Sequence, residues 1–294
     1  MEGFKRIGVL ADWEHPYKTM DPGFEAEEVK VFGEMYKKGY IYKGLKPVYW
    51  CPNDETALAE AEIEYQDDPC TTVYVKFQMK DDQGKLAAYD HSKLYFVIWT
   101  TTIWTLPGNL AIALHPDESY ALVKAPNGET YIMAEALVEK VMKVGGFDSW
   151  EIAETHPGSF FENMLAQHPF LDKTSRLLLA DYVTMDSGTG CVHTAPGFGA
   201  DDYQTCRRYG MEMVVPVDDR GRHTDYAGKY AGMKTEESNP VILADMKESG
   251  ALFASEEIVH SYPHCWRCKK PIIFRATPQW FCSVDAFKDE ACAA

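Results

Sequence analysis

The stretch VIWTTTIWTLPGN, residues 97–109, sets three consecutive threonines between two tryptophans and ends at a Pro-Gly-Asn turn. The residues that lead into it, KLYFVIW, are rich in β-branched and aromatic side chains, which favour a strand. A strand that only fills a core has no need of three hydroxyls in a row, although buried threonines can also satisfy one another. The stretch therefore predicts a strand whose hydroxyls bind either each other or a ligand.

A second stretch, DSGTGCVHTAPGFGADDY at residues 186–203, combines backbone freedom with ionisable side chains. Five of its residues between 188 and 199 are glycine or proline, so backbone amides can approach a ligand closely. It also carries the imidazole of His193 and the carboxylates of Asp201 and Asp202. The alternative is a loop whose solvated acidic pair opens a helix, where negative charge is favourable.

Composition limits the classes of protein that this chain can belong to. Its 294 residues, 46% hydrophobic and 25% charged, are ordinary for a globular protein of one large or two modest domains. No apolar run approaches the ~18 residues of a membrane span, and the N-terminus lacks a signal-peptide core. We therefore expect a soluble, cytoplasmic protein without a membrane partner.

The formal net charge of −16 argues against broad affinity for nucleic acid, because phosphate binding comes mainly from lysine and arginine. A polyanionic partner would need a local basic patch. The candidates are Arg207, Arg208, Arg267, Lys269, Lys270 and Arg275.

The order of elements favours an α+β fold. Residues 21–39 read as a helix, and from about Thr71 the chain changes to short β-type segments, with a hairpin turn at 126–128. Two further helices are predicted at 134–144 and 239–250. Short strands with separate helices fit a barrel-like sheet with peripheral helices.

The cysteines predict either reduced thiols or a metal site, since eight of them spread over a long chain do not form a disulfide framework. Cys265 and Cys268 have the C-x₂-C spacing of a structural zinc site, but the matching Cys51-Pro-Asn-Asp54 supplies only one thiol. Three thiolates with Asp54 or His264 could complete a tetrahedron around zinc. A decayed site with free thiols is the alternative.

Together, WTTTxWTLPGN and GTGxVHTAPGxGxDDY resemble the editing (connective polypeptide 1) domain of bacterial-type isoleucyl-tRNA synthetases. The flanking segments KPVYWCPNDETALAEAEIEY and HSYPHCWRCKKPIIFRATPQWF are similar to the two stalks of that domain. Valyl and leucyl enzymes typically carry Thr-Thr-Arg-Pro where this chain has Thr-Thr-Thr-Ile. The HIGH and KMSKS signatures of ATP activation are absent, so we do not expect this chain to charge tRNA.

The resemblance implies a β-barrel-like editing domain with peripheral helices at 71–255. Two β-type stalks, at 45–70 and 256–280, would insert it into a Rossmann-like catalytic domain. Residues 1–44 and 281–294 would be remnants of that domain, so we expect a fragment cut at both ends.

The implied activity is post-transfer editing, the hydrolysis of the ester of valine mischarged on isoleucine tRNA. The implied partners are the tRNA acceptor end and a valine or isoleucine ester, and the implied state is a monomer. Editing needs no cofactor, whereas ATP and Mg²⁺ belong to the parent enzyme, which ligates isoleucine to tRNA. The rival interpretation is a non-catalytic module that binds the acceptor end.

By position in the motifs, Asp202 would bind the α-ammonium of the substrate through a charge-assisted bond. His193 would limit the size of the amino-acid side chain, or else brace the loop. Asn109 would contact the nucleotide, or else stabilise the turn. The other implied site residues, catalytic or substrate-binding, are Trp99, Thr100, Thr101, Thr102 and Thr105. Ile103 replaces the usual proline and Phe198 a frequent histidine.

Overall fold

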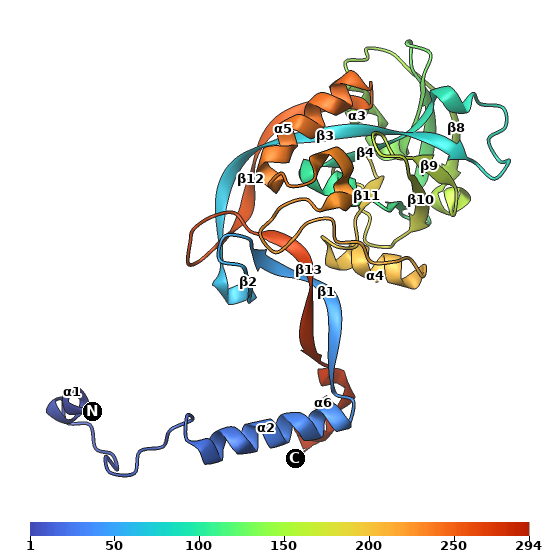
Figure 1. Ribbon diagram of the computed structural model, residues 1–294. Coiled ribbons are helices and arrows are strands. Elements are labelled where there is room, and N and C mark those ends of the chain that lie inside the picture. Colours follow the sequence, from blue (N-terminus) through green and yellow to red (C-terminus); the bar gives the residue numbers. More distant parts are fainter. Residues whose placement is uncertain (294) are drawn as a thin grey trace. The chain divides into compact units, whose positions relative to one another are not determined.

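The computed structural model describes residues 1–293, and they form two compact units (Figure 1). The larger unit comprises residues 46–277, and the smaller one residues 1–45 with the described residues from 278 onward. The chain passes between them within strands β1 (Ile41–Cys51) and β13 (Ile273–Cys282).

The larger unit is built on a barrel. Six strands pair in the closed order β3-β9-β10-β5-β11-β4-β3, because β4 returns to pair with β3 along Val73–Gln78. Closure leaves these strands no free edge. They are β3 (Ile63–Asp81), β4 (Leu94–Thr100), β5 (Ala111–Leu114), β9 (Leu165–Gln167), β10 (Thr174–Leu179) and β11 (Val192–Thr194). The predicted barrel-like sheet is confirmed.

Further strands extend this barrel on both sides. Strand β12 (Leu252–Cys265) pairs antiparallel with β3 along nearly its whole length, which Figure 1 shows as a long ribbon. On the other side, β4 also pairs with β7 (Thr130–Ala134), which is followed in the sheet by β6 (Ser119–Lys124) and β8 (Glu151–Pro157). The predicted hairpin joins β6 to β7, and Gly128 has the positive φ of +80° that its turn requires.

The sequence explains why the barrel is stable. Its strands supply fully buried apolar side chains, in β4 from both faces, among them Val75, Phe77, Phe96, Val97, Ile98 and Ile112. The adjoining strands β6 and β7 add Leu122 and Ile132. Each such side chain contributes about 1.5–3 kcal/mol by its burial. The core therefore lies inside the barrel and under the helices that cover it, and the cavities described below open at its margin.

The two helices predicted in this region are confirmed, with shifted ends. Helix α3 (Val138–Val144) is preceded by a 3₁₀ turn, η4 (Glu135–Leu137). Helix α5 (Thr235–Glu248) starts four residues before the predicted 239 because Glu237 bonds back to the backbone of Lys234. Helix α4 (Ala200–Arg208) starts at the predicted acidic pair.

A second sheet, of the order β13-β1-β2, is completed by β2 (Thr56–Leu58). The remaining elements of the larger unit are short 3₁₀ helices. These are η1 (Glu60–Glu62), η2 (His91–Lys93), η3 (Ile103–Gly108), η5 (Gly158–Phe161) and η6 (Asp225–Tyr230).

The smaller unit contains α1 (Glu2–Arg6), α2 (Pro22–Lys37), η7 (Val284–Ala286) and α6 (Lys288–Ala293). Helix α2 confirms the prediction for 21–39, with Pro22 at its first position and Gly39 at a positive φ of +77° after its end. Its apolar side chains stay exposed, Val29 by 72%, although the ring of Phe32 meets Trp280 edge-on at 5.4 Å. None of the helices in residues 1–293 is long and apolar enough to cross a membrane.

Candidate active site

Strand pairing brings the two motif stretches together. Strand β11 runs parallel to β4, with Val192 opposite Trp99, so the end of one motif strand lies beside the end of the other. Strand β4 stops at Thr100, and the chain then turns into η3 (Ile103–Gly108). The threonine run therefore lies next to His193, although about eighty residues separate the motifs in sequence.

The threonines have two places in the structure. Some of them hold the turn: Thr100 Oγ1 accepts a hydrogen bond from the Thr102 amide at 3.0 Å, and Thr105 Oγ1 donates to the Thr102 carbonyl at 2.7 Å. The same residues, Thr100, Thr102 and Thr105, also line a cavity of about 370 Å³.

This cavity, here called the inner cavity, brings together most of the predicted site residues. His193 and Asp202 line it with the three threonines. Thr101 and Trp99 do not line it; each faces an adjoining cavity instead. Residues of both motif stretches, including the carboxylate of Asp202, therefore converge on one cavity.

His193 is held in one orientation by a directional hydrogen-bond network. Asn109 Nδ2 lies 2.8 Å from His193 Nδ1, and His193 Nε2 lies 3.0 Å from Thr105 Oγ1. Because an amide nitrogen only donates, Nδ1 accepts and Nε2 carries the proton. Ser175 Oγ donates to Asn109 Oδ1 at 2.5 Å, which fixes the amide in turn.

This network makes His193 a rigid, uncharged group. Burial lowers the pKa of His193 to about 3, so its imidazole stays neutral at physiological pH. Both ring nitrogens are engaged, and neither is free to take a proton from water. The network also places Asn109, which is fully buried and donates to the Ala111 carbonyl at 2.8 Å. Asn109 therefore lies behind His193 as part of the loop's support.

Asp202 lies in the first turn of α4, and its neighbour Asp201 is exposed. Its Oδ2 accepts a hydrogen bond from the Ala195 amide at 2.8 Å. Burial raises the pKa of Asp202 to about 6, in spite of that hydrogen bond. The carboxylate is thus charged at neutral pH but poorly solvated, which favours the binding of a cation.

The rest of the inner cavity is apolar and aromatic. Phe198 packs edge-on against Trp104 with ring centres 4.8 Å apart. Ile103 is buried at the start of η3. Sequence reasoning missed Tyr262, Pro263, Ile272 and Phe274, which line the cavity from the segment predicted as the second stalk. Only the fold could find them, since no motif spacing links them to the threonines.

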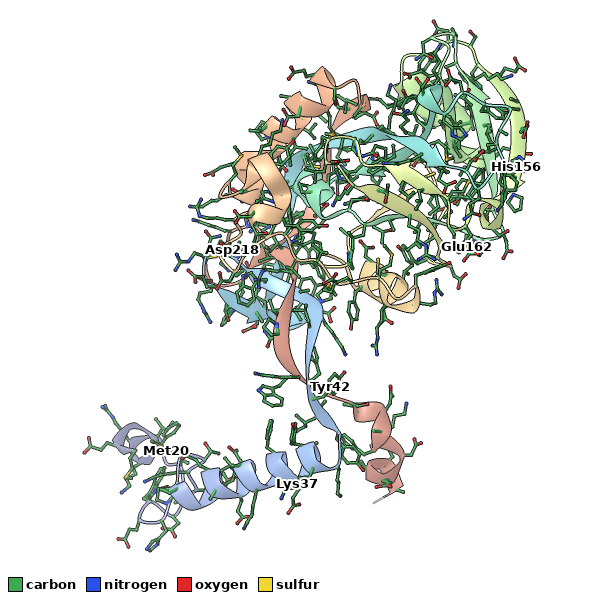
Figure 2. All side chains as sticks on the ribbon, turned by 45° about the vertical axis from the view of Figure 1, so that its right-hand side comes forward. Met20, Lys37, Tyr42, His156, Glu162 and Asp218 are labelled. Atoms are coloured by element: carbon green, nitrogen blue, oxygen red, sulfur yellow. The ribbon has the colours of Figure 1, made fainter. Side chains whose placement is uncertain are left out.

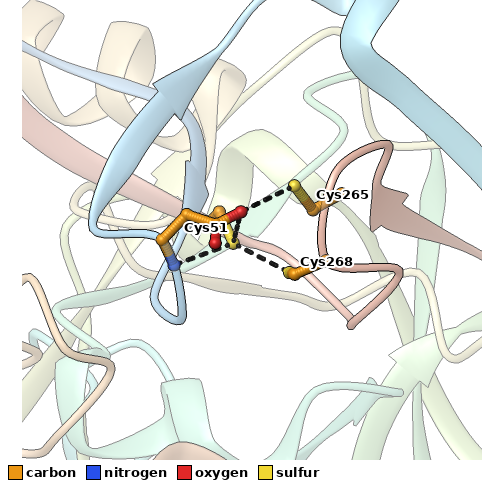
Figure 3. Close-up of side chains that lie close together, drawn as sticks. Cys51, Cys265 and Cys268 are labelled. Atoms are coloured by element: carbon orange, nitrogen blue, oxygen red, sulfur yellow. Dashed lines mark hydrogen bonds between the residues drawn. The ribbon is translucent and has the colours of Figure 1, made fainter.

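A cluster of thiols lies elsewhere in the larger unit (Figure 3). One ligand atom each from Cys51, Asp54, Cys265 and Cys268 lies within 4.8 Å of all the others. Cys51 Sγ is 3.5 Å from Cys268 Sγ, and Asp54 Oδ2 is 3.3 Å from Cys265 Sγ. Tetrahedral zinc with Zn–S bonds of about 2.3 Å would set its ligands about 3.8 Å apart, so this donor set can hold a metal.

The structure selects Asp54 as the fourth member of this cluster and corrects the alternative of His264. The His264 ring lies elsewhere: its Nε2 is 3.3 Å from Asp68 Oδ2 and its Nδ1 is 3.1 Å from the Tyr262 carbonyl. Burial raises the pKa of the Cys51 thiol to about 12, so in the absence of a cation this cysteine is protonated.

The family model of class I tRNA synthetases (I, L, M and V) matches residues 1–294. The isoleucine–tRNA ligase of Caldicellulosiruptor saccharolyticus is 55% identical over 293 residues, which are 99% of this chain and 32% of that protein. The ligase of Thermoanaerobacter sp. strain X514 is 54% identical, over 99% of this chain and 31% of the relative.

Two solved structures share the fold. The editing domain of P. knowlesi cytosolic leucyl-tRNA synthetase matches with a TM-score of 0.51 at 12% identity, over 65% of this chain and 97% of that one. The P. falciparum counterpart matches with a TM-score of 0.50 at 11% identity, over 63% and 99% of the two chains.

The chain therefore belongs to the class I tRNA synthetases, in the group of the isoleucine, leucine, methionine and valine enzymes. Over nearly its whole length it is similar to isoleucine–tRNA ligases, and it has the fold of a synthetase editing domain. It spans about a third of the length of those ligases, 32% in the first comparison.

The half-buried, poorly solvated carboxylate of Asp202 predicts a measurable effect on stability. Because folding raises the pKa of Asp202 from 3.8 to about 6, the stability this group confers is complete below its unfolded pKa and is lost as pH rises through about 6. The cost at pH 7 is about 3 kcal/mol. Asp202→Asn keeps an acceptor for the Ala195 amide, so we expect a higher free energy of unfolding at pH 7.

Urea unfolding across pH measures this difference. We expect it to vanish below about pH 4, where the carboxyl is protonated in both states. The matched control is Asp201→Asn on the same helix turn, which should change stability by less than about 0.5 kcal/mol because Asp201 is exposed. An Asp202→Asn variant less stable than the wild type at pH 7 would contradict the assignment.

Proposed function

We propose that the larger unit hydrolyses the ester bond between an amino acid and the 3′ end of tRNA, with valine on isoleucine tRNA as the substrate. The observation that carries this proposal is the inner cavity, where threonine hydroxyls, a neutral histidine and a poorly solvated carboxylate converge. A substrate that carries an ammonium beside an ester matches these three features. The segment boundaries predicted from the sequence, and the cytoplasm as the location, are parts of the same proposal.

The residues divide the work of ester hydrolysis. Asp202 binds the α-ammonium, since a poorly solvated carboxylate gains most from a cationic partner. The hydroxyls of Thr100, Thr102 and Thr105, which line the cavity, polarise the carbonyl and orient the attacking water. Water is the proposed nucleophile, because the cavity lining described in residues 1–293 contains no cysteine, serine or lysine. His193, with both ring nitrogens engaged, is also not free to activate a threonine hydroxyl.

His193 acts in this scheme as a wall. Attraction alone discriminates weakly between side chains that differ by one methylene, about 1–3 kcal/mol, and isoleucine against valine is itself the standard example. Exclusion by a fixed group is stronger, and the bonds to Asn109 and Thr105 fix this imidazole. A neutral ring also avoids repelling the substrate ammonium.

The first test concerns Asp202. Asp202→Asn should reduce the deacylation of valyl-tRNA about tenfold or more, because hydrogen bonds to charged groups contribute about 1.5–3 kcal/mol. The wild-type kcat/KM should also fall as pH drops below about 6, where the free carboxyl becomes protonated. Asp201→Asn is the control and should keep its activity. Full hydrolysis by a folded Asp202→Asn protein would refute the role.

The second test concerns the wall. His193→Ala opens the cavity, so correctly charged isoleucyl-tRNA should become a substrate while hydrolysis of valyl-tRNA falls less. The ratio of the two deacylation rates measures this and controls for a general loss of activity. If the variant spares isoleucyl-tRNA but loses activity on valyl-tRNA, His193 serves catalysis or folding and the wall lies elsewhere.

We also propose that the thiol cluster holds one structural zinc ion through Cys51, Asp54, Cys265 and Cys268. Three thiolates and a carboxylate suit tetrahedral zinc, and the ion would link the turn after β1 to the turn before β13. Plasma mass spectrometry should find about one zinc per chain, lost in the Cys265→Ser, Cys268→Ser double variant. A count near zero in the wild type would show a decayed site with free thiols.

The second candidate function is a non-catalytic module that binds the acceptor end: with a net charge of −16 this chain binds the polyanionic tRNA weakly, which disfavours turnover. Valyl-tRNA binding and deacylation are measured at low and at moderate salt, because electrostatic binding of tRNA is strongest at low salt. A chain that binds valyl-tRNA at low salt without hydrolysing its ester would be the non-catalytic module. The ATP- and Mg²⁺-dependent ligation of isoleucine is proposed for a parent enzyme alone.

A further inference from the structure

Three cavities of the larger unit adjoin one another. A middle cavity of about 220 Å³ shares Thr102, Trp104 and Tyr262 with the inner cavity. An outer cavity of about 430 Å³ shares Thr235 and Pro271, among others, with the middle one. The shared lining residues place the three spaces side by side in the order inner, middle and outer, and Asp202 lines the inner one; this row of cavities is here called the path.

The outer end of this path is basic in a strongly acidic chain. Arg220, Lys234 and Lys270 line the outer cavity, and Glu236 is the one carboxylate in its lining as described within residues 1–293. Asp218, labelled in Figure 2, marks the segment that leads to Arg220, on the opposite side of this unit from His156. With a net charge of −16, three cations around one cavity are a local exception.

These cations are available to a ligand. Lys234 and Lys270 are exposed, and within the described residues neither forms an ion pair; Lys270 Nζ reaches only Asn53 Oδ1, at 3.4 Å. Arg220 pairs with Glu55 at 3.3 Å, but both side chains are about half exposed. An exposed pair contributes about 0–1 kcal/mol, so a phosphate can replace that carboxylate.

The middle cavity suits a nucleobase. Trp104 and Tyr262 supply aromatic surface on which a base can stack. Asn239 also lines it, and its buried Oδ1 has no hydrogen-bond partner among the described residues. An unpaired buried acceptor is costly, and the exocyclic amino group of adenine or cytosine would satisfy it.

We propose that Arg220, Lys234 and Lys270 bind the phosphates of the unpaired 3′ strand of tRNA, and so guide its end into the path towards Asp202. The order of the cavities matches the order of groups along that strand: ester innermost, base next, phosphates outermost. Guidance by a few cations also reconciles tRNA binding with the acidic chain, because only this surface needs a positive potential. The proposal rests on the proposed function for the identity of the strand.

The test measures binding of the fluorescein-labelled single-stranded RNA ACCA to the 294-residue chain by fluorescence anisotropy, over a range of salt. Lys234→Gln and Lys270→Gln should each weaken binding by about two- to fivefold at low salt. The slope of log affinity against log salt should fall by about 0.7 for each cation removed. Lys247→Gln, at the other end of α5, is the matched control and should bind as the wild type does.

A second measurement separates this inference from the proposed function. Valyl-adenosine carries the ester but no phosphate, so its hydrolysis should be equal in the wild type and both lysine variants. Failure of the wild type to hydrolyse it, with lysine-dependent ACCA binding intact, would overturn the hydrolytic function and keep the phosphate path. The phosphate path would be overturned if the wild type did not bind ACCA. It would also be overturned if Lys234→Gln and Lys270→Gln left binding unchanged, or if Lys247→Gln weakened it equally.

Discussion

The parallel contact between β11 and β4 is the interaction on which the site depends. It closes the barrel, and it is short: Val192 opposite Trp99 is its single register pair. On the β4 side the chain leaves the strand at Thr100, and on the β11 side His193 follows at once. Two segments that are far apart in the sequence thus become walls of one cavity. The antiparallel pairing of β11 with β5 holds the β11–β4 contact in register.

The cavity is built at the expense of stability. A carboxylate whose pKa folding raises from 3.8 to about 6 disfavours the folded state at neutral pH, and a well-packed barrel has to offset that cost. The fully buried side chains of β3 and β4 do so within the same unit. A poorly solvated carboxylate in a cavity suits the binding of a cation, because a bound cation offsets the desolvation cost that the carboxylate carries when the cavity is empty.

The fold could be predicted from the sequence more fully than the arrangement of the site. Residue patterns predicted the sheet, the helices and the 126–128 hairpin, because burial and turn geometry act locally. They could not distinguish Thr101, which faces a neighbouring cavity, from Thr100 and Thr102, since that depends on where the strand ends. The role of Asn109 was also beyond a local pattern, because its partners, Ser175 and His193, come from other strands.

The network behind His193 bears on how such a pocket could change its specificity. Ser175, Asn109, His193 and Thr105 satisfy one another's buried polar groups, and they come from β10, β11 and the segment between β4 and β5. Replacing the histidine alone would remove one of the hydrogen-bond partners of the Asn109 amide group and one of those of the Thr105 hydroxyl, and an unsatisfied buried polar group costs about 1–3 kcal/mol. Mutations at these four positions should therefore be strongly epistatic. A pocket retuned for another amino acid has to pass through destabilised intermediates or change several strands together, which makes this wall slow to evolve and hard to redesign one residue at a time.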